Sequence, residues 1–307
     1  MSPDARSTLS DPSRRALLGV GAAASLAWLA GCATPLPLGA PEPASDAAAA
    51  RLLQASAEAH GLVAYRRLRD INIRYEGAWR PVIDSVQPVV VDKAYRGSSE
   101  ERLMPAAGIN AQAYTGTAGR KQVAWQRGDG SAARAGRVAV WRNGVPVTDA
   151  DVLAASALVA ECYGLFLLGP LWLAERGFNV QPGASERVDG RMCDVVQVWM
   201  RPGLGLVALD RVALCIDRTS GLTRRLRFTL EGFPGTRGAV AEVDTFDYER
   251  RFGVMWPMRS YEEVVHPIRL PAHDWRITGL DVDRGYDSAA LLGATFGGTA
   301  AEPAASL

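Results

Sequence analysis

The chain has 307 residues, of which 48% are hydrophobic, and its 34 Lys and Arg against 33 Asp and Glu give a net charge of +1. Such a balanced chain offers no single-sign surface for a phosphate backbone or for anionic lipid, which argues against a nucleic-acid-binding role. The length and apolar content suffice for a sizeable core, in one large β-rich domain or two smaller ones. We favour one domain.

The first 31 residues have the pattern of a bacterial export signal. Arg14 and Arg15 give a positive start, residues 17–30 are uncharged and largely apolar, and Leu29-Ala30-Gly31 forms a small-residue cleavage site before Cys32. We therefore expect a signal peptide over residues 1–31 and a mature chain whose Cys32 carries lipid, such as palmitate. The apolar run is shorter than the roughly 20 residues of a bilayer span. An uncleaved anchor and an ordinary signal peptide are the alternatives.

Two details of this leader bear on export and destination. Arg14-Arg15 with its neighbours resembles a twin-arginine export signal, although paired arginines also occur by chance in positive leaders, so the export route stays open. Ala33 follows the lipidated cysteine, in place of the aspartate that resembles an inner-membrane retention signal. We expect a lipid-anchored protein on the periplasmic side of a bacterial membrane, the outer membrane being favoured.

The start of the mature chain predicts a tether followed by two helical segments. Residues 32–46 contain four prolines and form a semi-extended tether behind the lipidated Cys32. Ser45 or Asp46 then caps a helix that Gly61 ends, and a second short helical turn covers residues 62–69. From Ile71 onward apolar and polar residues alternate, as in a half-buried antiparallel strand.

Period-two patterns and turn residues predict most of the body as strands. The expected strands are Ile71–Glu76, Val89–Tyr95, Glu101–Met104, Ala111–Tyr114, Lys121–Arg127, Arg137–Arg142, Met192–Met200, Ala208–Ile216, Leu222–Leu230, Ala239–Arg250, Met255–Val265 and Asp274–Asp283. Their short links predict an antiparallel meander. The body is expected to be one domain over residues 47–286, followed by a disordered tail over residues 287–307.

One apolar stretch, Val152 to Ala174, changes to a helical period. Thr148 and Asp151 have the spacing of a capping box that would open it. Gly164 and Gly169-Pro170 are expected to break it into two pieces, each too short to span a bilayer. We therefore predict a buried or lid-forming pair of helices.

Three cysteines follow Cys32. If residues 192–200 and 208–216 form a hairpin centred on Leu204, Cys193 faces Cys215 and the two could form a disulfide. The alternative is two reduced core cysteines. Cys162, inside the apolar stretch, is expected to be buried and inert.

The order of elements and several short phrases resemble the outer-membrane lipoprotein-sorting superfamily, the LolA/LolB-like fold. The phrases that carry the resemblance are His60-Gly61, Tyr65-Arg66-Arg67-Leu68, Cys215-Ile216-Asp217-Arg218-Thr219-Ser220-Gly221-Leu222, Gly253-Val254-Met255-Trp256-Pro257-Met258 and the segment Trp275 to Val282. The match covers roughly residues 47–283. It implies an α+β fold: an unclosed, strongly curved antiparallel sheet, or half-open β-barrel, of ten or eleven strands with helices in its concave face.

The resemblance also implies an apolar pocket for acyl chains. No arginine of this chain can be matched to the basic residue thought to help manage cargo in lipoprotein carriers. The chain is longer than those carriers and itself lipidated, which is more like a membrane-anchored receptor or acceptor than a soluble shuttle.

Independently of the resemblance, a curved sheet must cover its inner face, and the stretch from Val152 to Ala174 is the one segment able to do so. The side chains expected to face the sheet or a ligand are Leu153, Leu158, Leu165, Phe166, Leu168, Leu171 and Trp172. Core filling is the alternative to ligand lining for all of them.

Motifs of catalysis, metal binding and cofactor binding are missing from the sequence. Its three histidines lack metal-binding spacing, and there is no G-x-S-x-G turn and no phosphate-binding loop. We therefore expect a monomeric binding protein without cofactor, metal or catalytic residues, whose ligand is an acyl chain, a lipid or a lipoprotein. A scaffold lipoprotein with a self-filled core is the second hypothesis, and a hydrolase the third.

Overall fold

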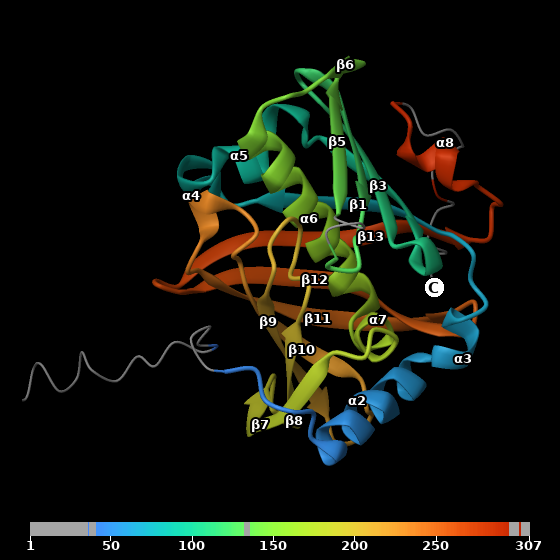
Figure 1. Ribbon diagram of the computed structural model, residues 1–307, viewed down its shortest axis with the longest axis vertical. Helices are drawn as coiled ribbons and strands as arrows, with labels where there is room; N and C mark the ends of the chain where they lie inside the picture. The colour runs from blue at the N-terminus through green and yellow to red at the C-terminus, as the bar shows by residue number, and fades with distance from the viewer. Residues whose placement is uncertain (1–35, 37–40, 132–135, 295–300, 302–307) are drawn as a thin grey trace, which may run out of the picture. The chain divides into compact units, whose positions relative to one another are not determined.

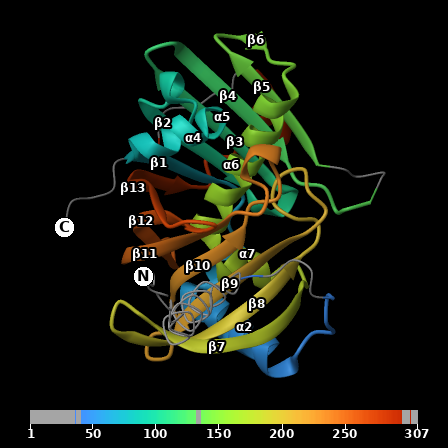
Figure 2. The same ribbon diagram turned by 90° about the vertical axis from the view of Figure 1, so that its left-hand side faces the viewer.

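A single antiparallel sheet of 13 strands forms the body of residues 38–307. This computed structural model describes residues 36, 41–131, 136–294 and 301. The strand order is β6-β5-β4-β3-β2-β1-β13-β12-β11-β10-β9-β8-β7, and Figure 2 shows this succession from top to bottom. The chain therefore runs outward from β1 to one edge and returns from the other edge to β13, which pairs with β1. The edge strands β6 and β7 do not pair with each other, so the sheet is open.

The strands are β1 Ile71–Trp79, β2 Ser98–Met104, β3 Ile109–Gly116, β4 Gly119–Gln126, β5 Arg137–Arg142, β6 Val145–Pro146, β7 Asn179–Val188, β8 Arg191–Met200, β9 Asp210–Asp217, β10 Thr223–Thr229, β11 Val240–Arg251, β12 Val254–His266 and β13 Leu270–Val282. The helices are α2 Ala47–His60, α3 Leu62–Tyr65, α4 Pro81–Val86, α5 Pro88–Val91, α6 Ala150–Leu168, α7 Pro170–Ala174 and α8 Ser288–Leu292, with 3₁₀ turns at Lys93–Tyr95, Pro105–Ala107 and Pro234–Thr236.

The predicted class, α+β with a curved antiparallel sheet, is confirmed. The predicted number of strands, ten or eleven, is too small. The two-residue strand β6 and the edge strand β7 were not expected. In β7, Pro182 and Gly183 interrupt the apolar alternation, which an edge strand tolerates because one side of its backbone needs no partner.

The predicted first helix is confirmed at both ends. The Asp46 side chain accepts hydrogen bonds from the backbone N–H groups of Ala48 (2.9 Å) and Ala49 (2.8 Å), which caps α2. Gly61 ends it with φ of 96°, a left-handed conformation that glycine adopts without strain. A Cβ on Gly61 would also overlap the carbonyl oxygen of Gly253 at 2.3 Å, so this turn lies directly on β12.

Helix α6 fills the concave side of the sheet, as Figure 1 shows. Asp149, rather than the predicted Thr148, caps it by accepting from the backbone N–H of Val152 at 3.0 Å. The helix continues through Gly164, so the predicted break there is wrong, whereas the break at Gly169-Pro170 is confirmed. Gly164 serves close packing instead: a Cβ there would lie 2.7 Å from the side-chain nitrogen of Asn110 on β3.

The predicted strand Val89–Tyr95 is wrong, because this segment forms α5 and a 3₁₀ turn. Its valine run has strand propensity, but Pro88 occupies the first turn of α5 and Asp92, with φ of 48°, ends it. Packing overrides propensity here, because Val91 is buried and Val90 contacts the main core.

The predicted register of β8 and β9 is also wrong. Cys193 lies opposite Asp217, and Cys215 lies opposite Val195. All three described cysteines, Cys162 included, are buried free thiols, so the predicted Cys193–Cys215 disulfide is not formed. Asp210 is the cause, since its carboxylate accepts from the backbone N–H of Leu204 at 2.8 Å and organises a longer connection than the predicted turn.

The predicted disordered tail is wrong for its first residues. Helix α8 begins after Asp287, whose side chain accepts from the backbone N–H of Ala290 at 2.7 Å. Its Leu291 is buried against Ile109 and Ala111 on the convex face of β3. The predicted signal peptide and the lipidated Cys32 lie outside the described residues.

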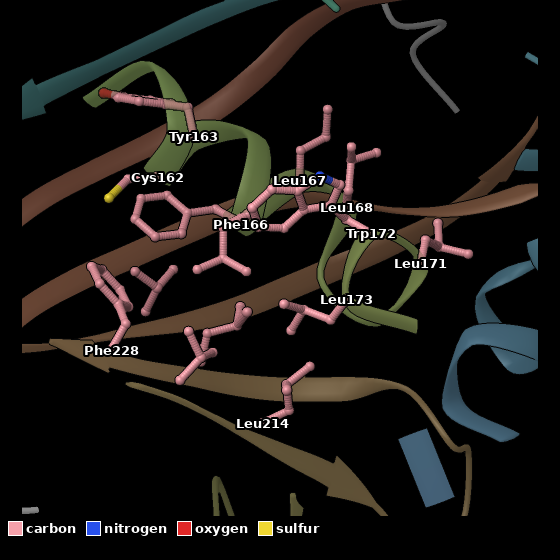
Figure 3. Close-up of a cluster of buried hydrophobic side chains, with 14 of the residues drawn as sticks. Cys162, Tyr163, Phe166, Leu167, Leu168, Leu171, Trp172, Leu173, Leu214 and Phe228 are labelled. Atoms are coloured by element: carbon pink, nitrogen blue, oxygen red, sulfur yellow. The ribbon is translucent and has the colours of Figure 1, made fainter. Parts of the chain in front are cut away.

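Within the described residues, α6 alone is long and apolar enough to cross a membrane by length and composition. Of its most apolar 18-residue window, 83% is buried inside the protein, as for the core helix of a folded domain. Figure 3 shows its side chains meeting those of the sheet, with Phe166 directed at Phe228, where the ring centroids are 5.2 Å apart.

Leu165 of α6, which is 0% exposed in the main core, tests this packing. Leu165→Ala should lower the free energy of unfolding by roughly 2–5 kcal/mol, because it leaves a cavity between helix and sheet. Urea denaturation followed by circular dichroism measures the loss. The matched control is Leu206→Ala in the β8–β9 connection, where the side chain is 50% exposed and the change should stay within about 0.5 kcal/mol. Equal losses in the two variants would contradict the assignment of α6 to the core.

Candidate functional site

A wide cavity of about 820 Å³ lies where α3 and α7 approach the ends of β3, β4 and β5. Aromatic and aliphatic side chains form part of its wall, namely Tyr65, Leu68 and Trp172. The turn Pro105–Ala107 and Gly108 form another part. Its volume falls in the range of roughly 300–1,000 Å³ that is usual for small-molecule sites.

Charged side chains also surround this cavity: Arg66, Asp129, Arg127, Arg137, Glu175 and Arg176. Arg66 donates to Glu175 (2.7 Å), and Arg137 donates to the side-chain oxygen of Gln126 (2.6 Å). Asp129 accepts from the backbone and hydroxyl of Ser131. The cavity therefore combines an apolar wall with a predominantly basic rim.

A small pocket of about 10 Å³ adjoins this cavity at α6, and we call it the narrow extension. It shares Arg127, Trp172 and Arg176 with the wide cavity and continues to Leu168 and Gly164. Trp172, at the start of the short helix α7, therefore separates the open part from the interior.

A buried ion pair closes the inner end of the extension. The Arg127 guanidinium on the loop after β4 donates to the Glu161 carboxylate of α6, and both side chains are at most 3% exposed. Arg127 also donates to the backbone oxygens of Pro202 and Gly203, and Glu161 accepts from the N–H of Gly205 at 2.6 Å. Burial raises the pKa of Glu161, and the charge of Arg127 opposes that rise. The pair thus joins α6, the sheet and the β8–β9 connection.

A second pocket, of about 60 Å³, lies between α6 and the helices α4 and α5. Its wall is mostly apolar and includes Leu158, Cys162 and Phe166. The carboxyl of Glu262 on β12 also lines it, and burial raises the pKa of this group to about 8. At neutral pH Glu262 is therefore mainly uncharged, which suits an apolar surrounding.

An aromatic and polar cluster lies behind this pocket. Tyr163 and the ring nitrogen Nδ1 of His273 are 3.2 Å apart, and His273 stacks on Trp79 with ring centroids 4.4 Å apart. Burial, followed by the charge of Arg96, holds the pKa of His273 well below its ordinary value. The imidazole is therefore neutral and structural in this setting. Among the described residues no group of three or more His, Cys, Asp or Glu is placed to hold a metal ion.

The seven residues expected to face the sheet or a ligand are distributed over different surroundings. Leu158 and Phe166 line the small apolar pocket, Leu168 lines the narrow extension, and Trp172 lines both the extension and the wide cavity. Leu165 and Leu171 are buried in the main core, and Leu153 packs at the edge of a neighbouring core cluster. Their role in binding stays a prediction.

Sequence reasoning missed the charged residues of the cavity, Arg127 and Arg176 foremost. Arg127 directly precedes the turn Gly128-Asp129-Gly130, and Arg176 directly follows Glu175, so neither has a sequence signal beyond an ordinary surface arginine. They come together because the end of β4 and the end of α7 meet at one edge of the half-barrel.

The Arg127–Glu161 pair predicts a non-additive effect on stability. Glu161→Gln should lower the free energy of unfolding by roughly 3–5 kcal/mol, because the buried charge of Arg127 loses its partner. The double variant Arg127→Met/Glu161→Met should lose less than the single variant, because no unpaired charge is left. Chemical denaturation of all three proteins measures this, and additive losses would contradict a buried ionic pair.

Glu262 predicts a pH dependence of stability. Its folded-state pKa of about 8 exceeds the ordinary value of 4.5, so between these values the folded protein holds a proton that the unfolded chain has released. This contribution is fully present below about pH 4.5 and is lost as the pH rises through 8. Glu262→Gln should therefore match the wild type at pH 4.5 and exceed it at pH 9, by on the order of a few kcal/mol. Parallel stability profiles would show that the carboxyl is ionised in the folded protein.

Comparison with known proteins finds likeness at the level of structure. No protein-family model matches the sequence, and no curated protein matches it. Among solved structures, a DUF1329 family protein from Desulfovibrio piger aligns with this chain at 11% sequence identity and a TM-score of 0.51. The alignment covers 81% of this chain and 98% of the Desulfovibrio piger protein.

Two further structures align with 79% of this chain at lower scores. An outer membrane lipoprotein-sorting protein domain from Vibrio parahaemolyticus is covered over 97% of its length, at 9% identity and a TM-score of 0.40. A LolA superfamily protein from Nitrosomonas europaea is covered over 96%, at 11% identity and a TM-score of 0.41. Scores this low add nothing to the argument. The likeness to the DUF1329 family protein agrees with the expected curved antiparallel sheet, and it extends to the fold alone.

Proposed function

We propose that this chain is a lipid-anchored envelope protein that binds an acylated molecule, either a lipid or a lipoprotein, in its half-barrel without transforming it. The sequence of residues 1–32 supports an anchor at Cys32 on the periplasmic side of the outer membrane. The fold supports a concave binding surface.

The observation that carries this proposal is that the wide cavity and the narrow extension at α6 share Arg127, Trp172 and Arg176 as wall residues. Tyr65, Leu68 and Trp172 give the cavity an apolar wall, and the extension continues along Leu168 toward the core. An acyl chain laid along this wall gains about 25 cal/mol for each Å² of apolar surface removed from water. Such binding needs a dry groove and no catalytic group.

The extension is too narrow for an acyl chain while Trp172 keeps its position. In the proposal Trp172 is therefore the movable wall. It lies on α7, a five-residue helix whose Leu171 and Leu173 are buried in the main core, so the proposal requires only the indole side chain to rotate. The ligand's tail then enters between Trp172 and Leu168, and its polar part stays in the wide cavity.

A scaffold lipoprotein with a self-filled core is the second candidate, and one observation favours it. Helix α6 packs so closely in the concave face that the apolar pocket beside it has a volume of only about 60 Å³. Under this reading the body contacts an envelope partner, and the wide cavity holds only water.

A substitution that narrows the cavity separates these candidates. Ala106 is exposed on the wall of the wide cavity, so Ala106→Trp should fill space there without disturbing the core. We expect a loss of roughly tenfold or more in affinity for a fluorescent fatty acid, at unchanged melting temperature. The matched control is Ala55→Trp on the solvent side of α2, which should bind like the wild type.

Native mass spectrometry of the gently purified wild type should also show co-purifying lipid. A clean apo mass together with no uptake of the fatty acid would favour the scaffold. Equal affinities in the Ala106→Trp and Ala55→Trp variants would place binding elsewhere in the protein.

A further inference from the structure

Arg176 is distinctive among the charged residues around the wide cavity. Each of the other arginines of the rim donates a hydrogen bond to a side-chain oxygen: Arg66 to Glu175, Arg137 to Gln126 and Arg127 to Glu161. Within the part of the chain that the structure describes, Arg176 instead stacks on Trp172, with its guanidinium carbon 5.0 Å from the ring centroid.

The surroundings of Arg176 make an unneutralised cation costly. Arg176 is half-buried, and its guanidinium lies close to Gly108: a Cβ at Gly108 would be 3.8 Å from Nη2 of Arg176. Burial first, and then the like charge of Arg127, lower the pKa of Arg176, but an arginine remains protonated in a protein. Glu161 acts against this lowering, but among the described residues Arg176 forms no ion pair with a carboxylate.

Two guanidinium groups flank the same indole ring. Arg127 lies 5.1 Å from the Trp172 ring centroid, and Arg176 lies 5.0 Å from it. Glu161 neutralises Arg127, so the pair of arginines together carries an excess positive charge next to the aromatic wall. Guanidinium forks match the oxygen geometry of carboxylates and phosphates, and such charge-assisted bonds are stronger than neutral ones.

We propose that Arg176 binds the anionic head group, a carboxylate or a phosphate, of the acylated ligand, while Trp172 packs against the first part of its tail. This inference rests on the proposed function and specifies its ligand as an anionic amphiphile. Arg176 recognises the head, and Arg127 keeps its structural pairing with Glu161. The rim thereby selects among lipids that the apolar wall alone would accept equally.

The test compares ligands that share a tail and differ in the head. Affinities of the full-length mature protein are measured for palmitate, for hexadecanol and for a palmitoyl lysophosphatidic acid, below their micelle concentrations. The wild type should bind one or both anionic ligands roughly tenfold or more tightly than hexadecanol. A preference shared by both anions identifies the charge as the feature recognised, and a preference for one identifies a carboxylate or a phosphate.

Substitutions then assign the preference to Arg176. Arg176→Gln should abolish it by weakening anion binding while hexadecanol binding stays within about twofold, and Arg176→Lys should retain part of it because the charge remains. Arg67→Gln, at an exposed arginine outside the cavity, is the matched charge-removal control and should keep the full preference.

Three other outcomes would contradict either the anion site or the proposed function. Equal affinity of the wild type for palmitate and hexadecanol overturns the anion site while leaving lipid binding intact, and this result does not depend on any variant folding. A preference that persists in Arg176→Gln also overturns it. No binding of any of the three ligands contradicts the proposed function itself.

Discussion

An open, curved antiparallel sheet exposes the apolar side of its strands unless another element covers it, and here α6 supplies the cover. Helix, sheet and the β8–β9 connection meet in one core, which includes Leu165 and Phe166 of α6. A helix that is apolar nearly all round is unstable in water, and a half-barrel without a filler would leave its strands exposed. Each therefore depends on the other, and the remaining features are arranged around their contact.

Charged and titratable side chains also occur inside this core. Arg127 and Glu161 pair in the narrow extension, whereas Glu262 is held neutral beside the small apolar pocket. These are two physical solutions to one problem, since a buried charge is tolerated when it is paired and a single carboxyl is tolerated when it keeps its proton. Arg176 follows neither solution. Its charge next to Trp172 is what distinguishes the wide cavity from an ordinary surface depression.

Much of the fold could be predicted from the sequence because its signals are local. Capping by Asp46 and termination by Gly61 define α2, and strands with clear alternation, such as Arg137–Arg142, are recovered with their bounds. The register of β8 and β9 could not be predicted. When the pairing of β8 with β9 shifts by two residues, every side chain stays on the same face of the sheet. The apolar pattern is therefore equally compatible with Cys193 opposite Cys215 and with Cys193 opposite Asp217.

Less of the candidate site could be predicted from the sequence, because its charged residues have no local sequence signal. Leu168 and Trp172 could be placed near the concave face because apolar residues at helical spacing must be buried somewhere. Arg127 and Arg176 are far apart in the chain, and only the meeting of β4 with α7 brings them to one cavity. Charges at strand and helix ends are common, so composition offers no means of selecting these two.

The burial of α6 can be measured most directly by hydrogen–deuterium exchange in the free protein. Peptides covering Ala150–Leu168 should exchange as slowly as those of the fully buried strand β9, Asp210–Asp217, because opening the helix requires separating it from the sheet. Exchange as fast as in the short helix α4, Pro81–Val86, would show that α6 does not roof the half-barrel and would contradict the account.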